Sequence, residues 1–416
     1  MDIITDNILR NPPVLLGLIA MFGLLVQHKP ISDVIKGSLT AAFGMVILST
    51  GVNMLLGSIA PINTAVQTSL GVSVSEGLSD ASFTAEYGGT VGVTMFVALA
   101  LHLAIARFTP IKTIFLTGNM LWWFPFVIVA GLVEAKVSGT MLIIVGAVLS
   151  ALYWSLGPWI TRRFVWDATG DDSFLIGHPT GILCIIAGSV ARVVGDKKKS
   201  TEDLDLPAGL SFFREISITG GLVMLVMNLI VGCFIPSLVP AKNNLISYSI
   251  QSSLEFAGGL LVLLYGVRLL INQIMPAFQG IAEKVVPGAK MAFDVPILFN
   301  YRPNAVLIGF IIAMISSTAM ILIVNTTNVF GVLLVPLVIT SFFECGGAAV
   351  IAEGQGGLRG AIIGTAVAAA VMVILVAISG TMLSTTIQNW LFVFGGNDLS
   401  VMSIIAKLLG MLFGGA

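Results

Sequence analysis

Long apolar runs separated by short polar connections constrain the fold of this chain more than any other feature. A helix needs about 20 mostly apolar residues to cross a bilayer. The 416 residues are 56% hydrophobic and only 10% charged, whereas soluble domains contain about 25% charged residues. We therefore predict an all-α polytopic membrane protein. About eleven candidate crossings lie at 13–28, 33–58, 88–107, 111–133, 139–160, 216–239, 247–275, 303–325, 328–343, 360–383 and 399–414.

Basic residues are concentrated on alternate connections, which predicts an outside N-terminus and a cytoplasmic C-terminus by the positive-inside rule. The opening sequence MDIITDNILRNPP is acidic where a signal peptide is basic, so the first run is interpreted as a retained helix. The chain has no basic face or zinc-finger spacing, which argues against a nucleic-acid partner. The residues on the predicted cytoplasmic side include Lys29, Lys36, Arg107, Lys112, Arg162, Arg163, Arg192, Lys197, Lys198, Lys199 and Arg214.

Two apolar stretches are too interrupted for plain spanning helices. Residues 173–195 contain SFLIGHPTG, and residues 341–359 contain five glycines and two glutamates. Such segments enter a membrane only where protein or water covers their open backbone. We interpret both as re-entrant hairpins, and ordinary cytoplasmic loops remain the alternative.

An internal repeat relates the two halves of the chain. Residues 44–61 and 259–276 align without gaps, with seven identical positions of eighteen. Asp80 and Asp294 follow the two copies at nearly equal distances. The predicted topology runs the copies in opposite directions, which makes the halves an inverted repeat of the kind found in alternating-access transporters. We place the first repeat, with its hairpin, at 13–195, the second at 216–383 and a C-terminal helix at 399–414.

Four polar residues near the Gly- and Pro-rich interruptions are candidate substrate contacts. His178 offers one donor and one acceptor, which suits a vicinal diol or enediol, although a structural hydrogen bond is the alternative. Asp294 is an intramembrane carboxylate and therefore a functional candidate, or else a helix N-cap. Asp80 is its repeat counterpart or a cap, and Glu344 lies in the second interrupted segment.

The stretch GNMLWWFP adds Asn119, Trp122 and Trp123 to the candidate site. These tryptophans lie near the predicted mid-depth of the membrane, where they form either an aromatic platform for a sugar face or an interhelical packing contact. The three cysteines lie far apart in apolar sequence, so neither a metal site nor a disulfide framework is expected. No cofactor is predicted.

Several segments resemble the ascorbate-type enzyme IIC, the membrane subunit of a bacterial phosphoenolpyruvate-dependent phosphotransferase system (PTS). They are IGH at 176–178, STEDLDLP at 200–207, AFQGIAEKVVPGAKMAFD at 277–294, PNAVLIGF at 303–310 and GGLRGA at 356–361. The resemblance implies a single IIC domain over 1–416, with a core and a V-shaped dimerisation domain in a homodimer. It implies import of L-ascorbate across the bacterial inner membrane for phosphorylation by a separate phosphorylated IIB subunit, so the chain alone is not catalytic. It assigns substrate contacts to Gly177, His178 and Asp294.

Other positions depart from that family pattern. The family reads like LTGH followed by two glutamines where this chain has LTGN and then Trp122 and Trp123, and a glutamine stands where this chain has Pro179. HPTG is similar to the hairpin of the galactitol-type IIC, so a related sugar or polyol is a second substrate hypothesis. A proton-coupled secondary transporter using Asp294 or Glu344 is the alternative function, and the energy source for uptake separates the two.

Overall fold

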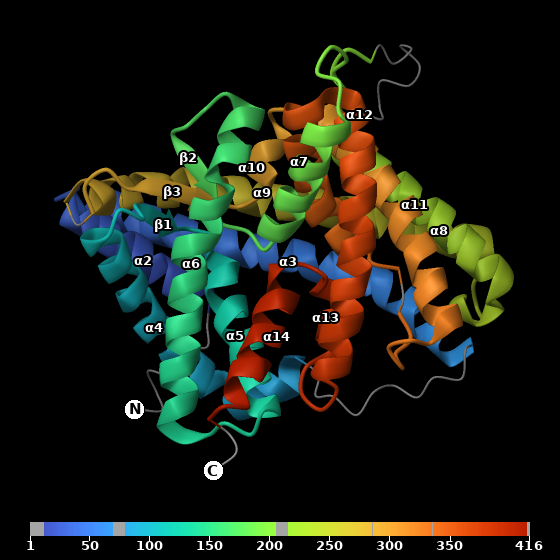
Figure 1. Ribbon diagram of the computed structural model, residues 1–416, viewed down its shortest axis with the longest axis horizontal. Coiled ribbons are helices and arrows are strands. Elements are labelled where there is room, and N and C mark those ends of the chain that lie inside the picture. The colour runs from blue at the N-terminus through green and yellow to red at the C-terminus, as the bar shows by residue number, and fades with distance from the viewer. Residues whose placement is uncertain (1–11, 70–79, 205–214, 285, 335, 414–416) are drawn as a thin grey trace.

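The computed structural model describes residues 12–69, 80–204, 215–284, 286–334 and 336–413. Helices dominate, as their apolar sequences predict (Figure 1). The helices are α2 (Pro12–Val26), α3 (Ile31–Ser69), α4 (Asp80–Phe108), α5 (Gly118–Glu134), α6 (Gly139–Thr169), α7 (Gly181–Val194), α8 (Ile216–Phe234), α9 (Leu245–Lys284), α10 (Pro296–Phe299), α11 (Pro303–Thr327), α12 (Val338–Met382), α13 (Gln388–Phe394) and α14 (Asp398–Gly410), with a short 3-10 helix at Pro236–Leu238.

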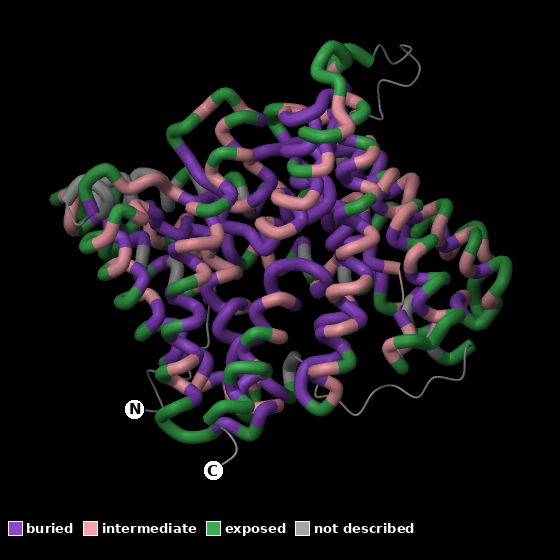
Figure 2. The backbone as a smooth tube through the Cα atoms, in the orientation of Figure 1, coloured by how far each residue is buried: buried purple, intermediate pink, exposed green. Residues whose placement is uncertain are grey.

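The outer helices carry the exposed apolar surface expected of a membrane protein. Within the described ranges, six helices are long and apolar enough to cross a bilayer, and α5 and α7 are shorter apolar helices. Large apolar side chains such as Phe43, Leu261 and Ile315 are more than half exposed, which a lipid environment accommodates and water does not. Figure 2 shows that buried residues gather along the central elements, and the first part of α12 is buried over almost its whole length. The number of crossings, about eleven, stays a prediction.

The expectation of an all-α fold was wrong in one respect, because three short strands form a parallel sheet. They are β1 (Thr113–Phe115), β2 (Phe174–Ile176) and β3 (Lys290–Phe293), in the order β1-β3-β2. Each strand has an apolar carboxyl end. β1 and β2 are fully buried, and β3 is partly buried. Backbone groups in an apolar interior must be paired, and a sheet pairs those that the interrupted helices leave open. The expected span 111–133 is accordingly β1 followed by α5.

Residues 328–343 do not form the spanning helix that the sequence predicted. The described residues of 328–337 are not helical, and α12 begins only at Val338, two residues after Pro336. Proline disfavours helical backbone in the residue before it and lacks an N–H. Both Asn325 side-chain groups bond the backbone of Leu334, which fixes this connection beside α11.

Helix α12 is a hairpin of two antiparallel arms. The backbone leaves the helical region at Gly356 and Gly357, and Gly357 has φ +60°, which glycine adopts without strain. Cys345 Sγ lies 3.7 Å from Met372 Sδ, and Gly364 packs beside Ala352. The interrupted segment 341–359 is therefore the first arm and the tip of this hairpin, and whether it is re-entrant stays a prediction.

The two copies of the internal repeat pack against each other as α3 and α9. A Cβ at Gly51 would lie 2.4 Å from the backbone nitrogen of Leu263, and a Cβ at Gly266 would lie 2.4 Å from that of Leu48. Position numbers rise along one helix as they fall along the other, so the helices cross antiparallel. Gly51 aligns with Gly266 and Leu48 with Leu263 in the repeat. The crossing is therefore reciprocal, because the glycine of each helix packs against the leucine of the other helix.

The predicted membrane sidedness needs one correction. Gly410 of α14 packs against Ala135, and Lys407 Nζ lies 3.9 Å from Glu134 Oε1. The end of α14 therefore shares one end of the molecule with the connection that holds Lys136. Lys136 is one of the few basic residues on the connections that the positive-inside rule places outside, and the same rule places the C-terminus in the cytoplasm. These two predictions cannot both hold. The reason is that α14 begins near the centre of the molecule, beside Gly181, and not at the opposite face.

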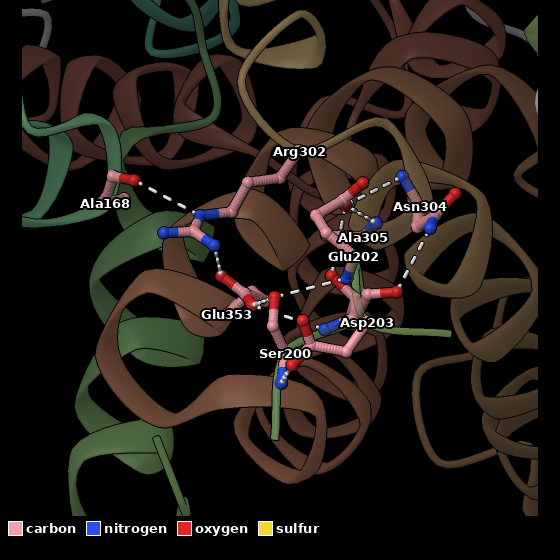
Figure 3. A network of polar contacts seen from close by, with 9 residues as sticks. Ala168, Ser200, Glu202, Asp203, Arg302, Asn304, Ala305 and Glu353 are labelled. Atoms are coloured by element: carbon pink, nitrogen blue, oxygen red, sulfur yellow. Dashed lines mark hydrogen bonds and ion pairs between the residues drawn. The ribbon is translucent and has the colours of Figure 1, made fainter. Parts of the chain in front are cut away.

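A buried polar network fastens the loop after α7 to α11 and α12 (Figure 3). Glu353, whose side chain is 2% exposed, pairs with Arg302 and accepts a bond of 2.6 Å from Ser200 Oγ. Glu202 Oε1 accepts the backbone N–H of Asn304 at the start of α11. The hairpin tip joins the same cluster, because the N–H of Asp196 donates to the carbonyl of Gly356. One buried carboxylate thus holds three segments together.

Truncating this network is expected to have unequal effects. Arg302→Ala leaves the Glu353 carboxylate buried without its cation and should destabilise the fold by about 2 kcal/mol, because unpaired buried charges are costly. Glu353→Ala should cost less, because Arg302 is 28% exposed and can reach water. Asp167→Ala is the matched control, since Asp167 and Arg192 are about half exposed and such pairs contribute about 0–1 kcal/mol. Thermal unfolding of the detergent-solubilised variants measures the order of their stabilities. Equal unfolding midpoints for Arg302→Ala and Asp167→Ala would contradict the expected order.

Candidate functional site

Three segments that the sequence singled out meet at one edge of the sheet. The carboxyl ends of parallel strands share an edge, and ligands bind there in open α/β sheets. Ile176 pairs with Phe293 and Phe115 with Ala292, so the residues after the strands lie side by side. The N–H of Gly177 donates to Phe293 at 2.7 Å, and that of Leu116 donates to Ala292 at 2.9 Å. The sheet therefore brings Asn119, His178 and Asp294 to one place.

Helices α5, α7 and α10 begin at this edge, immediately after the three strands. Helix N-termini carry unpaired N–H groups and a partial positive charge, which favour polar oxygen atoms nearby. Broken helices whose ends point at a central site are the membrane-protein form of this arrangement. The local fold thus supplies polar backbone groups inside an otherwise apolar molecule.

Gly177 allows β2 to approach β3 closely. A Cβ at this position would lie 2.8 Å from the carbonyl oxygen of Ala292 and 3.1 Å from the Phe115 ring. Contacts this short force backbone or side chains to move, so a larger residue would displace the tip that carries His178. The predicted role of Gly177 in the site is consistent with this steric requirement, and direct contact with substrate stays a prediction.

His178 and Asp294 face each other across the edge. His178 Nε2 lies 3.6 Å from Asp294 Oδ1, and the side chains are 6% and 14% exposed. Asp294 Oδ1 also accepts the N–H of the next residue, Val295, at 2.8 Å. Val295 is the N-cap of α10 and Arg302 that of α11, so the N-cap role considered for Asp294 from sequence is wrong. His178 Nδ1 is buried and has no hydrogen-bond partner within the described part of the chain. A buried polar atom of this kind is costly unless a ligand or water bonds it.

A small cavity of about 80 Å³ lies against these residues. Its polar lining comes from Asn119, His178, Asp294 and Glu344, and its apolar lining includes Leu48, Leu55 and Leu263 at the α3–α9 crossing. A larger and more open groove of about 1110 Å³ lies between Met54 and the start of α9. None of the predicted site residues lines that groove, so the smaller cavity is the candidate substrate site.

Glu344 reaches the cavity from the first arm of α12. Its Oε1 accepts a bond of 2.7 Å from Asn397 Nδ2, and its Oε2 is buried with no partner among the residues that the structure describes. Thr180 Oγ1 donates to the carbonyl of Glu344 at 2.8 Å, which ties this arm to the His178 tip. The structure therefore brings Asn119, His178, Asp294 and Glu344 together, although they come from four distant parts of the sequence.

The turn before α14 was missed by sequence reasoning. Asp398 accepts the N–H groups of Gly181 at 3.0 Å and Ile182 at 2.8 Å, and the hydroxyl of Tyr153 at 2.5 Å. Its own N–H donates to the carbonyl of Pro179. The sequence GGND at 395–398 is a recognisable signal, since Asn397 caps α14 through the N–H of Leu399. This turn supports the His178 tip from the far end of the chain.

The remaining predicted residues lie elsewhere. Trp122 is buried in the packing between helices, and Trp123 packs against Trp390 with ring centroids 4.9 Å apart. Neither lines the cavity, and their contact with substrate stays a prediction. Pro179 is buried in the tip. Asp80 begins α4, but its side chain lies outside the described residues.

A cavity with four polar lining side chains, among apolar helices and at the point where broken helices begin, is typical of a membrane transport protein for a small polar solute. The EIIC-GAT family, described as "PTS system sugar-specific permease component", matches residues 7–398. The chain therefore belongs to this family of PTS sugar permeases. With its apolar helices, family membership makes it a multi-pass protein of the inner membrane.

One curated relative is the "Ascorbate-specific PTS system EIIC component" of Mycoplasma pneumoniae. The two are 24% identical over 420 aligned positions, which cover 86% of this chain. The alignment covers 63% of that relative's length, so this chain spans somewhat less than two thirds of it. The match agrees with the ascorbate-type resemblance found in the sequence.

Proposed function

We propose that this chain is the membrane subunit of a PTS that imports L-ascorbate or a related sugar or polyol, which a phosphorylated IIB partner modifies at the cytoplasmic exit. The single observation that carries the proposal is the His178–Asp294 pair in a buried cavity at the sheet edge. Imidazole and carboxylate groups bond the hydroxyls of such substrates. The family match and the ascorbate-specific relative support the substrate class.

The proposal includes alternating access by an inverted repeat. The reciprocal Gly51–Leu263 and Gly266–Leu48 contacts support it, because a two-fold axis through the crossing exchanges the two pairs. The halves 13–195 and 216–383 are the proposed repeats, with 399–414 as the added helix. The cavity is lined by both α3 and α9, so sliding the sheet edge past their crossing would expose it to either side.

A homodimer and the separate core and V-shaped dimerisation domains belong to the same proposal. Helices α2, α3, α8 and α9 contact one another and are the candidates for the dimerisation domain. We place the loop containing Lys197, Lys198 and Lys199 on the cytoplasmic side, where it could meet a IIB partner. Its basic character supports this placement by the positive-inside rule.

A proton-coupled secondary transporter is the second candidate. The specific observation in its favour is the presence of two acids, Asp294 and Glu344, in the cavity lining. Carboxylates inside a membrane are common proton carriers in transporters. In this mechanism the solute would arrive unmodified and no soluble partner would be needed.

Uptake measurements separate the two candidates. In inverted vesicles or cells, group translocation predicts that accumulation requires phosphoenolpyruvate and the soluble PTS proteins, and that the product is phosphorylated. An uncoupler that collapses the proton gradient should leave this accumulation largely unchanged. Unmodified product together with loss of uptake on uncoupling would favour the secondary transporter instead.

A further inference from the structure

Two residues that line the cavity each carry a buried polar atom without a hydrogen-bond partner among the described residues. The atoms are Glu344 Oε2 and His178 Nδ1, and their residues are only 5% and 6% exposed. Both residues line the cavity. Leaving a buried polar group unpaired is costly, and more so for a charged group. Because both residues line the same cavity, we expect a bound ligand to complete their bonding.

The position of Glu344 is fixed independently of any ligand. Asn397 Nδ2 holds Oε1 at 2.7 Å, and Thr180 Oγ1 holds the backbone carbonyl of the same residue. Asn397 is itself anchored, because its Nδ2 also donates to Phe394 and its Oδ1 accepts the N–H of Leu399. One oxygen of Glu344 is therefore occupied and the other is free for a donor. A preorganised acceptor of this kind discriminates between ligands by what they can donate.

The charge of the lining limits which ligands fit. The cavity has two carboxyl groups, Asp294 and Glu344, and the described residues that line it include no Lys or Arg. L-Ascorbate is a monoanion at neutral pH, so its charge would enter a weakly screened site with no basic lining side chain among the described residues to offset it. The hydroxyls of a neutral polyol donate to carboxylates without adding charge.

We propose that Glu344, held by Asn397, is a specificity-determining contact that makes this cavity select an uncharged polyol or sugar over the ascorbate anion. The inference rests on the proposed function, since it concerns the substrate of the same site. It goes beyond that function by choosing between the two substrate classes. The departures at Trp122, Trp123 and Pro179 from the ascorbate-type pattern agree with it.

Calorimetric titration of the purified full-length protein tests the proposal. The probes are xylitol, D-arabitol, galactitol and sodium L-ascorbate at neutral pH. We expect at least one polyol to bind saturably, about tenfold or more tighter than ascorbate. Glu344→Gln keeps an oxygen for Asn397 but replaces the carboxyl group with an amide. It should weaken the affinity for the polyol about tenfold, while the affinity for ascorbate changes little or increases. Glu134→Gln is the matched control, because it removes a carboxyl near the far end of α5 and should leave the ratio unchanged.

The outcomes separate this inference from the proposed function. If wild type binds ascorbate more tightly than every polyol, or if Glu344→Gln leaves the ratio of affinities within about twofold, the inference is overturned while PTS import of ascorbate stands. If Glu344→Gln does not fold, the wild-type ratio alone decides. Uptake that is independent of phosphoenolpyruvate would reject the proposed function, whichever probe binds.

Discussion

His178→Ala should abolish measurable substrate binding and uptake while the protein stays folded. The substitution removes the imidazole that faces Asp294 at 3.6 Å and leaves that carboxyl group without its neighbour. It also removes one of the partnerless atoms that we expect the ligand to bond. A site built to bond hydroxyls loses much of its affinity when one group is deleted, so we expect about a hundredfold or greater weakening. Titration with whichever probe saturates the wild type measures it.

His102→Ala is the matched control, because His102 is equally buried and outside the cavity lining. Its Nε2 accepts the N–H of Phe115 at 3.1 Å and its Nδ1 lies 2.8 Å from Ser155 Oγ, so its role is to fix β1 against α6. This variant should lower thermal stability more than binding. Binding by His178→Ala within about threefold of wild type would remove His178 from the site.

Gly51→Ala and Gly266→Ala should each destabilise the fold severely. Added methyl groups would lie 2.4 Å from the backbone nitrogens of Leu263 and Leu48, and backbone cannot rotate away as a side chain can. Overpacking typically costs about 1–3 kcal/mol, and contacts with backbone on both sides of the crossing favour the upper part of that range. We expect low yield and a clearly lowered unfolding midpoint for both variants, by similar amounts because the contacts are reciprocal.

Gly57→Ala is the control on the same helix, since nothing lies within 4 Å of a Cβ at that position. It should be neutral or slightly stabilising, because alanine is the better helix former. If Gly51→Ala behaves like Gly57→Ala, the close crossing of α3 and α9 is not a structural requirement. A large effect at Gly51 with none at Gly266 would argue against the reciprocal geometry.

The helices were largely predictable because hydropathy reports burial in lipid directly. The predicted runs 139–160 and 303–325 lie within α6 and α11, and their starts coincide. The broken segments were also located correctly, since glycine and proline near Gly177 and Gly356 are local signals. Which secondary structure forms at these breaks depends on segments that are distant in the sequence. β2 exists because β3, more than a hundred residues away, pairs with it, and three-residue strands have too little sequence to show a period.

The candidate site was also partly predictable from the apolar composition of the chain. His178, Asp294 and Glu344 are conspicuous because polar residues are rare in an apolar chain, and each one lines the cavity. Asp398 was not identified, because an aspartate at a helix start is ordinary in sequence and gains its meaning only from Gly181 and Tyr153 across the molecule. Trp122 is buried between helices and Trp123 packs against Trp390, and depth along a predicted helix does not indicate which way such side chains point.

The short sheet separates the parts of this protein that can vary from those that cannot. Each strand is only three or four residues long, and its hydrogen bonds use backbone atoms, which are the same for every residue type except proline. The side chains just beyond the strand ends, such as His178 and Asp294, can therefore be exchanged without altering how the strands align. New substrate preferences could arise by single substitutions at these tips. The backbone of the sheet would then stay constant while the side chains at the strand ends vary. This is a physical route by which one permease fold serves chemically different sugars.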